Sequence, residues 1–294
     1  MGGYFGARLA AAGEDVTFIA RGAHFDALQT KGLRITSPKG NVHLPKVKVT
    51  DRVADIGPVD VVLLTVKLYD VVAAAASLGP LMGPETVVIT LQNGVEAVEM
   101  VGKHVGNEHV AGGAAYIVAV IDAPGHIRHT VADMLVFGEH NGERSPRLVA
   151  FEEAGRRAGF QAKVSEDIVT DLWIKFVRLT TWSGLTTVTR SPMGVIRSDP
   201  EMLALMMTAL DEAIAVGQAR GIQFPDAVIP ETAAMIQGFP FDSKSSMLEA
   251  LERGQRLELP WLSGAVSRLG RESGVPTPAH TFITTVLTPF VQPG

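Results

Sequence analysis

A single lysine, Lys175, interrupts an apolar stretch near the middle of this 294-residue chain. In the segment LWIKFVRL (residues 172–179) its neighbours leave almost no polar face on the helix that the pattern predicts. Burial disfavours the ammonium form and lowers the pKa of a lysine, which makes it a useful general acid near neutral pH. The pattern also fits a lysine whose long side chain reaches out to water. Both interpretations stay open on the residue types alone.

A second candidate site lies at the N-terminus. Gly2 precedes a predicted helix at 4–12 and a predicted strand at 15–20, which ends at Arg21. This is the order of the later parts of a dinucleotide-binding βαβ unit. A helix starting after Gly2 would direct its free N–H groups at a pyrophosphate, and an arginine at the end of this strand suits the 2′-phosphate of NADP. A plain glycine turn and a solvated arginine are the structural alternatives.

Two further polar residues follow predicted strands directly. Lys67 comes after the apolar run at 60–66, and Asn93 comes after the run at 86–91. The carboxyl ends of parallel strands are where doubly wound sheets bind ligands. Asn-Gly is also an ordinary turn signal, so the shared location is the stronger argument. We expect both residues to lie at one binding edge.

The acidic and histidine residues give weaker signals. Glu258 stands just before a helix that we expect Pro260 to start, where the dipole favours a carboxylate, and it also fits a plain first-turn charge. The eight histidines show no metal-ligand spacing, so no metal site is predicted. His126 and His129 fall in a predicted strand or hairpin, and we interpret them as structural.

The sequence predicts two kinds of secondary structure to position these candidate residues. Up to about Ser165, short apolar runs alternate with helical segments, which predicts an α/β, Rossmann-like doubly wound parallel sheet. Beyond that point the pattern is helical at a 3.6-residue period. We therefore predict a dinucleotide-binding domain at 1–165 and an all-helical substrate and catalytic domain at 166–294.

Composition narrows the class of protein. The chain is 46% hydrophobic and 19% charged, as in ordinary globular proteins, and its net charge of −5 argues against nucleic acid or an anionic membrane as a partner. It has no cysteine, which excludes disulfides and fits a cytoplasmic protein. We expect no transmembrane segment, because charged residues interrupt every apolar run. The sequence leaves the oligomeric state open, with a homodimer among the options.

The first strand of the βαβ unit is missing from this sequence, since nothing but Met1 precedes Gly2. That strand normally lies at the centre of the sheet, and its loss leaves unpaired strand edges. The residues after Gly2 nevertheless fit a working cofactor site. We expect Met1 to be an internal methionine of a longer protein, with about ten upstream residues forming one strand and a glycine turn.

The chain resembles the ketopantoate reductase (2-dehydropantoate 2-reductase) family over nearly its whole length. The matching stretches are GGYFGARLAAAGEDVTFIARG, VKLYD, TLQNGVEAVE, LWIKF, SSMLEALERGQRLEL and GVPTP. Members of this family reduce a 2-keto acid with NADPH, using a Rossmann domain followed by a helical domain. The resemblance implies the same reaction here, by default the reduction of 2-dehydropantoate to pantoate.

Carried over residue by residue, the resemblance makes Lys175 the catalytic proton donor and places Glu258 beside the lysine and the cofactor. It makes Asn93 a contact of both nicotinamide and substrate. Ser246 matches a serine that binds the substrate carboxylate.

For the cofactor, the resemblance makes Lys67 a contact and Arg21 the residue that selects NADP(H), with Gly2 as the third glycine of the motif.

The chain departs from the family at the substrate. Three family asparagines correspond to Leu179, Ser183 and Met193, and an acid near the glutamate is replaced by Pro260. Ser183 keeps a hydroxyl for substrate binding. Another branched or apolar 2-keto acid is therefore an alternative substrate, since lost donors change selectivity by roughly 10⁴ or more.

Two other classes remain open. The β-hydroxyacid dehydrogenases share the domain plan, although the SSM and RLEL stretches argue against them. A non-catalytic binding protein is the alternative that the incomplete cofactor motif suggests.

Overall fold

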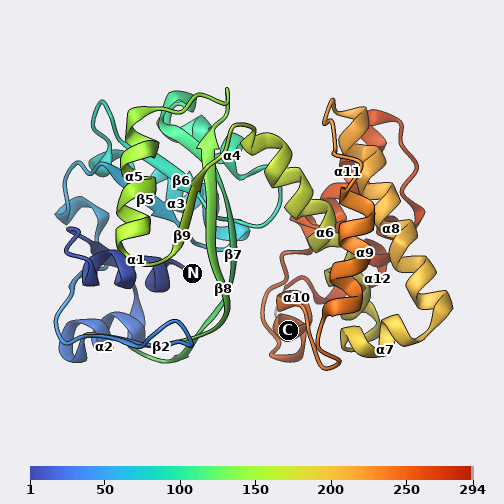
Figure 1. The fold of residues 1–294 in the computed structure, drawn as a ribbon, viewed down its shortest axis with the longest axis horizontal. Coiled ribbons are helices and arrows are strands. Elements are labelled where there is room, and N and C mark those ends of the chain that lie inside the picture. Colours follow the sequence, from blue (N-terminus) through green and yellow to red (C-terminus); the bar gives the residue numbers. More distant parts are fainter. Residues whose placement is uncertain (293–294) are drawn as a thin grey trace. The chain divides into compact units, whose positions relative to one another are not determined.

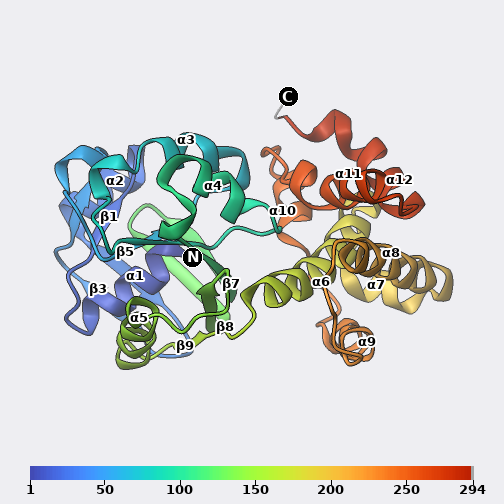
Figure 2. The ribbon, with the colours of Figure 1, turned by 90° about the horizontal axis from the view of Figure 1, so that it is seen from above.

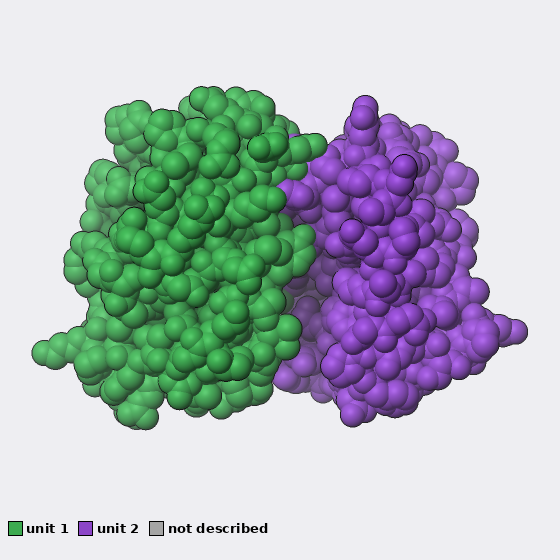
Figure 3. All heavy atoms as spheres, in the orientation of Figure 1, with its two compact units in different colours: residues 1–92, 97–168 green, residues 93–96, 169–294 purple. Residues whose placement is uncertain are grey.

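The computed structural model describes residues 1–292. Contacts between residues divide the chain into two compact units (Figures 1 and 3). The first comprises residues 1–92 and 97–168, and the second comprises residues 93–96 and 169–294. A four-residue segment from the first half of the chain therefore belongs to the second unit.

The first unit is built on a seven-stranded sheet with the order β3-β2-β8-β7-β6-β5, in which β9 also pairs with β8. Its strands are β2 (Leu33–Thr36), β3 (Val42–Leu44), β5 (Val61–Leu64), β6 (Val87–Thr90), β7 (Val110–Ala123), β8 (His126–Glu139) and β9 (Gln161–Val164). The strands β5, β6 and the start of β7 are parallel and almost fully apolar, as expected for strands covered on both faces.

The sheet is mixed, so the prediction of a purely parallel sheet is wrong. The long strands β7 and β8 form an antiparallel hairpin, and β2 pairs antiparallel with β3. A two-residue turn at Pro124-Gly125 joins β7 to β8, and such a turn can connect only antiparallel neighbours.

A separate two-stranded parallel sheet contains β1 (Thr17–Ile19) and β4 (Lys48–Thr50). Among the described strands, β1 pairs only with β4, and β5 pairs only with β6. β1 and β5 each have one edge without a partner strand among the described strands, and they are not hydrogen-bonded to each other. This is where a doubly wound domain places its first strand.

Helices cover both faces of the main sheet. They are α1 (Gly2–Ala11), α2 (Gly22–Lys31), α3 (Val71–Ala76), α4 (Ala97–Val105) and α5 (Pro146–Arg157). Figure 2 shows α3 and α4 on one side of the sheet and α1 and α5 on the other. The expected α/β, Rossmann-like fold is confirmed.

The second unit is helical, as predicted. Its helices are α6 (Ile168–Thr189, which starts at the last residue of the first unit), α7 (Met193–Ser198), α8 (Pro200–Ala219), α9 (Val228–Gly238), α10 (Ser246–Glu252), α11 (Ser263–Ser273) and α12 (Pro278–Leu287). One apolar core joins α6, α8, α11 and α12, with Trp173 packed edge-on against Phe176.

Helix α8 is the one candidate for a membrane span among the described helices. It is long and apolar enough by length and composition, although Glu201, Asp211 and Glu212 interrupt it as expected. Its buried residues, including Met206, Leu210 and Ile214, pack into the core of the second unit. A core helix of a globular protein passes the same test, so this helix gives little support for a membrane span.

Candidate active site

The start of α1 is packed tightly onto the strands of the first unit. A Cβ atom added to Gly2 would lie 2.5 Å from Oγ1 of Thr65, just after β5. One added to Gly3 would lie 2.2 Å from the Ile127 side chain, and one added to Gly6 would lie 2.7 Å from the Phe18 ring. Glycine at positions 2 and 6 therefore lets the helix lie close to Thr65 and Phe18, whereas the end of the Ile127 side chain could move away from a Cβ at position 3. This is the close helix–strand packing that a dinucleotide-binding unit requires.

Positive charge gathers at this helix start. Lys67 follows β5, and its charge, together with burial as the larger cause, lowers the pKa of the Met1 amino group. The first N–H groups of α1 have no acceptors within the helix, and the helix dipole is positive at this end. Such an arrangement favours a bound anion. Gly2 and Lys67 thus fit the pyrophosphate of a dinucleotide.

Arg21 lies at the expected turn between β1 and α2. Its backbone is extended, with φ −138° and ψ 159°, and it is the N-cap residue of α2. The side chain is exposed and makes no cap hydrogen bond. It is therefore available to a charged group at the end of β1.

A glutamine that the sequence reasoning missed ties two strand ends together. Gln92 is buried, and its Nε2 donates to the carbonyl oxygens of Leu64 and Val66 at 2.9 and 3.1 Å. The chain just before Lys67 is thereby joined to the chain just before Asn93. The signal was its place in TLQNG, directly ahead of the asparagine.

Asn93 itself belongs to the second unit, with residues 93–96. An ion pair holds this segment there: Nη2 of Arg268 on α11 donates to both carboxylate oxygens of Glu96 at 2.7 Å. The Glu96 carboxylate contributes to raising the pKa of Arg268 against the effect of burial. The pair fixes the segment that carries Asn93 to the helical unit.

Lys175 lies on α6 and interacts with Glu258. Burial lowers the pKa of Lys175 from 10.5 to about 8, while the charge of Glu258 acts in the opposite direction. The glutamate is itself buried at 7% exposure. The lysine therefore does not behave as a freely solvated surface residue. Its amine can exchange a proton near neutral pH, as a general acid must.

The helix start at Glu258 differs from our expectation. Pro260 lies in a 3-10 turn at Leu259–Trp261, which Glu258 caps, and α11 begins only at Ser263. Leu262 separates the two with φ −110° and ψ −109°, values outside the helical region. The α11 dipole therefore does not explain the position of this carboxylate, whose charge acts on Lys175.

Ser183 shares a helix face with the lysine. Lys175, Leu179 and Ser183 are four residues apart on α6 and so lie one above another. Ser183 is 1% exposed, and its Oγ has no hydrogen-bond partner among the described residues. Buried hydroxyls normally find a partner, so this one is suited to a ligand or an ordered water.

Ser263 is a second orphaned hydroxyl that the sequence reasoning missed. It is fully buried, and its Oγ also has no partner among the described residues. A Cβ added to Gly184 on α6 would lie 3.0 Å from this oxygen. Ser263 therefore lies against the part of α6 that carries Ser183, and nothing in the local sequence identified it.

Two other positions that the resemblance relates to the substrate, Ser246 and Met193, differ in their exposure. Ser246 is exposed in the first turn of α10, while its neighbour Ser245 is buried and caps that helix. Oγ1 of Thr186 on α6 donates to Oγ of Ser245 at 2.8 Å, which joins α10 to α6. Met193 is fully buried and packs in the apolar core of the second unit.

Within residues 1–292, no group of three or more His, Asp or Glu side chains is arranged so that it could hold a metal ion.

Comparison with known proteins identifies the family of this chain. The family model described as ketopantoate reductase PanE/ApbA matches residues 1–142, and that of its C-terminal domain matches residues 167–290. The chain belongs to the ketopantoate reductase family. A 2-dehydropantoate 2-reductase of Mesorhizobium japonicum is 34% identical over 95% of this chain and 91% of its own length.

Solved structures agree with the family assignment. A PanE/ApbA family ketopantoate reductase from Ralstonia eutropha superposes with a TM-score of 0.90 at 27% identity, over 97% of this chain and 93% of its own. A D-mandelate dehydrogenase solved with NADH and anilino(oxo)acetate shares the fold, with a TM-score of 0.88 at 20% identity over 99% and 95% of the two chains. Membership in the ketopantoate reductase family makes this chain an oxidoreductase of the 2-dehydropantoate 2-reductase type.

Proposed function

We propose that this protein reduces a 2-keto acid to a 2-hydroxy acid with NADPH, with 2-dehydropantoate as the default substrate. The observation that carries the proposal is the partly buried Lys175, whose pKa burial lowers to about 8 beside the carboxylate of the buried Glu258. In a family of keto acid reductases, such a lysine has the properties of the acid that protonates the keto oxygen.

The roles of the catalytic residues follow from their charges. Lys175 donates a proton from Nζ to the substrate's keto oxygen as negative charge develops there. Glu258 keeps the amine protonated, because a nearby carboxylate favours the charged form of a lysine. Asn93, held in the same unit by the Glu96–Arg268 pair, orients the substrate and the nicotinamide. NADPH, when bound, supplies the hydride.

The choice of NADPH over NADH rests on Arg21. Its exposed guanidinium follows β1, where it can pair with the 2′-phosphate that only NADPH carries. Gly2 and the N-terminus of α1, with Lys67, bind the pyrophosphate. The mandelate dehydrogenase structure contains NADH, so the fold by itself is compatible with either cofactor.

The substrate-binding residues favour a second candidate as well. Leu179 is apolar and Met193 is buried in the core, so neither supplies a hydrogen bond to a substrate hydroxyl. The unpartnered hydroxyls of Ser183 and Ser263 remain as donors, together with the exposed Ser246 for the substrate carboxylate. A branched or apolar 2-keto acid that lacks the terminal hydroxyl of 2-dehydropantoate is therefore the alternative substrate.

A panel of 2-keto acids, assayed by NADPH and NADH absorbance, tests the proposal. We expect turnover with NADPH of 2-dehydropantoate and of at least one analogue without the hydroxyl. A preference for 2-dehydropantoate above about a hundredfold would exclude the alternative substrate. No turnover of any 2-keto acid, with NADPH binding retained, would support a binding protein without catalysis.

A cytoplasmic location and a homodimer belong to the same proposal. Both are consistent with the cysteine-free, acidic sequence and are tested by fractionation and by light scattering.

A further inference from the structure

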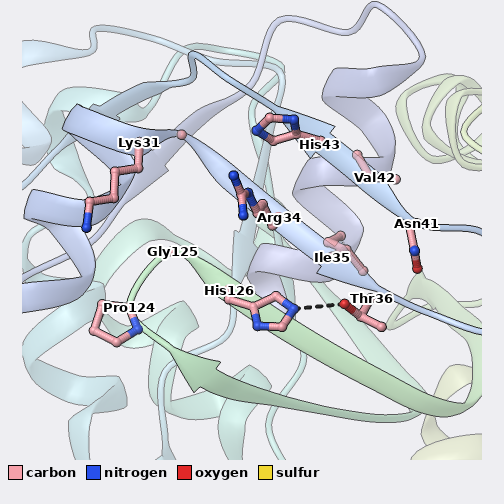
Figure 4. Close-up of a pocket in the computed structure, with 11 residues that line it drawn as sticks. Lys31, Arg34, Ile35, Thr36, Asn41, Val42, His43, Pro124, Gly125 and His126 are labelled. Atoms are coloured by element: carbon pink, nitrogen blue, oxygen red, sulfur yellow. Dashed lines mark hydrogen bonds between the residues drawn. The ribbon is translucent and has the colours of Figure 1, made fainter.

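A hollow on the first unit is lined by basic and polar side chains. Its volume is about 660 Å³, in the range of small-molecule sites. Figure 4 shows Arg34 of β2 between Lys31, His43 and His126. None of the described residues that line the hollow is acidic. In a chain with a net charge of −5, this local positive charge stands out.

The sheet register places three of these side chains in one row. Arg34 is directly opposite His43 on β3 and directly opposite His126 on β8. Arg34 and Thr36 are exposed on this face, whereas Leu33 and Ile35, which alternate with them along β2, are buried. The row thus places the Arg34 guanidinium between two imidazole rings on one exposed face of the sheet.

The wall on the β8 side is already fixed. Oγ1 of Thr36 lies 2.9 Å from Nε2 of His126, and Nδ1 of the same ring lies 3.6 Å from the Asp122 carboxylate, which also pairs with Arg128. Both nitrogens of His126 thus have neighbours. In the described part of the chain, Lys31 and Arg34 make no ion pair, so their charges remain available.

We propose that this hollow binds a small molecule through its phosphate or pyrophosphate group. The planar guanidinium of Arg34 matches two phosphate oxygens, Lys31 adds a second cation, and His43 is positioned to donate from β3. A hollow of this volume suits a small molecule rather than a protein surface. β3 and β2 lie at the opposite edge of the sheet from β5, so the site is distinct from Gly2 and Lys67.

The test is calorimetric titration with inorganic pyrophosphate at constant ionic strength. We expect saturable binding that Arg34→Gln weakens at least tenfold and Lys31→Gln weakens by less. Arg34→Lys should recover part of the loss, because charge returns without the planar fork. Arg34 is exposed, so its replacement leaves the core intact, and unfolding curves check this directly.

Two control variants test whether pyrophosphate binds in the hollow. One tests for a general effect of removing a positive charge, and the other tests for binding at the N-terminus of α1. Lys163→Gln removes an exposed cation on β9, outside the hollow, and should leave binding unchanged. Lys67→Gln weakens any binding at the α1 N-terminus and should leave the component that depends on Arg34. No binding at millimolar pyrophosphate, equal losses in the Arg34 and Lys163 variants, or loss only with Lys67→Gln would each overturn the proposal.

Discussion

The pH dependence of turnover should report the Lys175–Glu258 pair. The pKa of Lys175 is lowered to about 8, and only its protonated form can donate to the keto oxygen. We therefore expect kcat/KM to be constant toward neutral pH and to fall about tenfold per pH unit above about pH 8. An ordinary lysine would place this fall above pH 10.

Replacing Glu258 by Gln should shift this fall to lower pH. The charge of Glu258 raises the pKa of Lys175 against burial, and Gln keeps the shape of the side chain without that charge. A neighbouring opposite charge is worth about 1–3 pKa units. With a shift of one unit, the protonated fraction at pH 8 drops from about a half in the parent to about a tenth in the variant. The rate of the variant at pH 8 is then about tenfold below its own low-pH plateau, against about twofold for the parent.

The assay is kcat/KM for the best 2-keto acid between pH 6 and 10, followed by NADPH absorbance. Glu201→Gln is the matched control, since it removes an exposed carboxylate at the start of α8 in the same unit. An unchanged midpoint in the Glu258 variant, or a midpoint near pH 10 in the parent protein, would refute the proposed coupling.

Three further predictions follow from other residues. Arg21→Ala should raise the KM for NADPH at least tenfold and leave that for NADH nearly unchanged, and equal effects on both would contradict its role. The pKa of buried His280 is lowered to about 4, chiefly by burial, so protonation opposes folding. Urea unfolding should show full stability above about pH 6.5 and a loss of up to about 3 kcal/mol as the pH falls toward 4, which His280→Gln should reduce. Arg268→Met should lower kcat about tenfold, because its ion pair with Glu96 holds the segment that carries Asn93. The free energy of unfolding should fall by less than about 1 kcal/mol, because the pair is partly exposed. A double variant with Glu96→Arg and Arg268→Glu restores an ion pair and should recover activity.

Local patterns made much of the fold predictable. The strands β5 and β6 are short apolar runs, and the helical second unit repeats apolar residues at helical spacing. The antiparallel pairing of β7 with β8 was foreseen only as the hairpin alternative at His126 and His129, because a strand's residue pattern does not show the direction of its partner. The strands β3 and β4 have three residues each and are too short to give a periodic signal.

Some residues of the candidate site could be predicted from the local sequence, and others could not. Lys175 was identifiable because a charge directly flanked by Trp173, Ile174 and Phe176 is unusual, and Lys67 because it follows a buried strand. The Glu96–Arg268 pair joins residues 172 positions apart, and Ser263 gains its meaning only from packing against Gly184. Such contacts form only in the folded chain and leave no signal in the local sequence. The Glu96–Arg268 pair fixes the segment that carries Asn93 to α11.

The most direct test of the central claim is to compare Lys175→Met with the parent protein for both NADPH binding and turnover of a 2-keto acid. If Lys175 is the proton donor, NADPH affinity should stay close to that of the parent while kcat falls by roughly 10²- to 10⁴-fold, the usual contribution of general acid catalysis. A loss of less than tenfold in kcat, with the protein folded, would contradict the account.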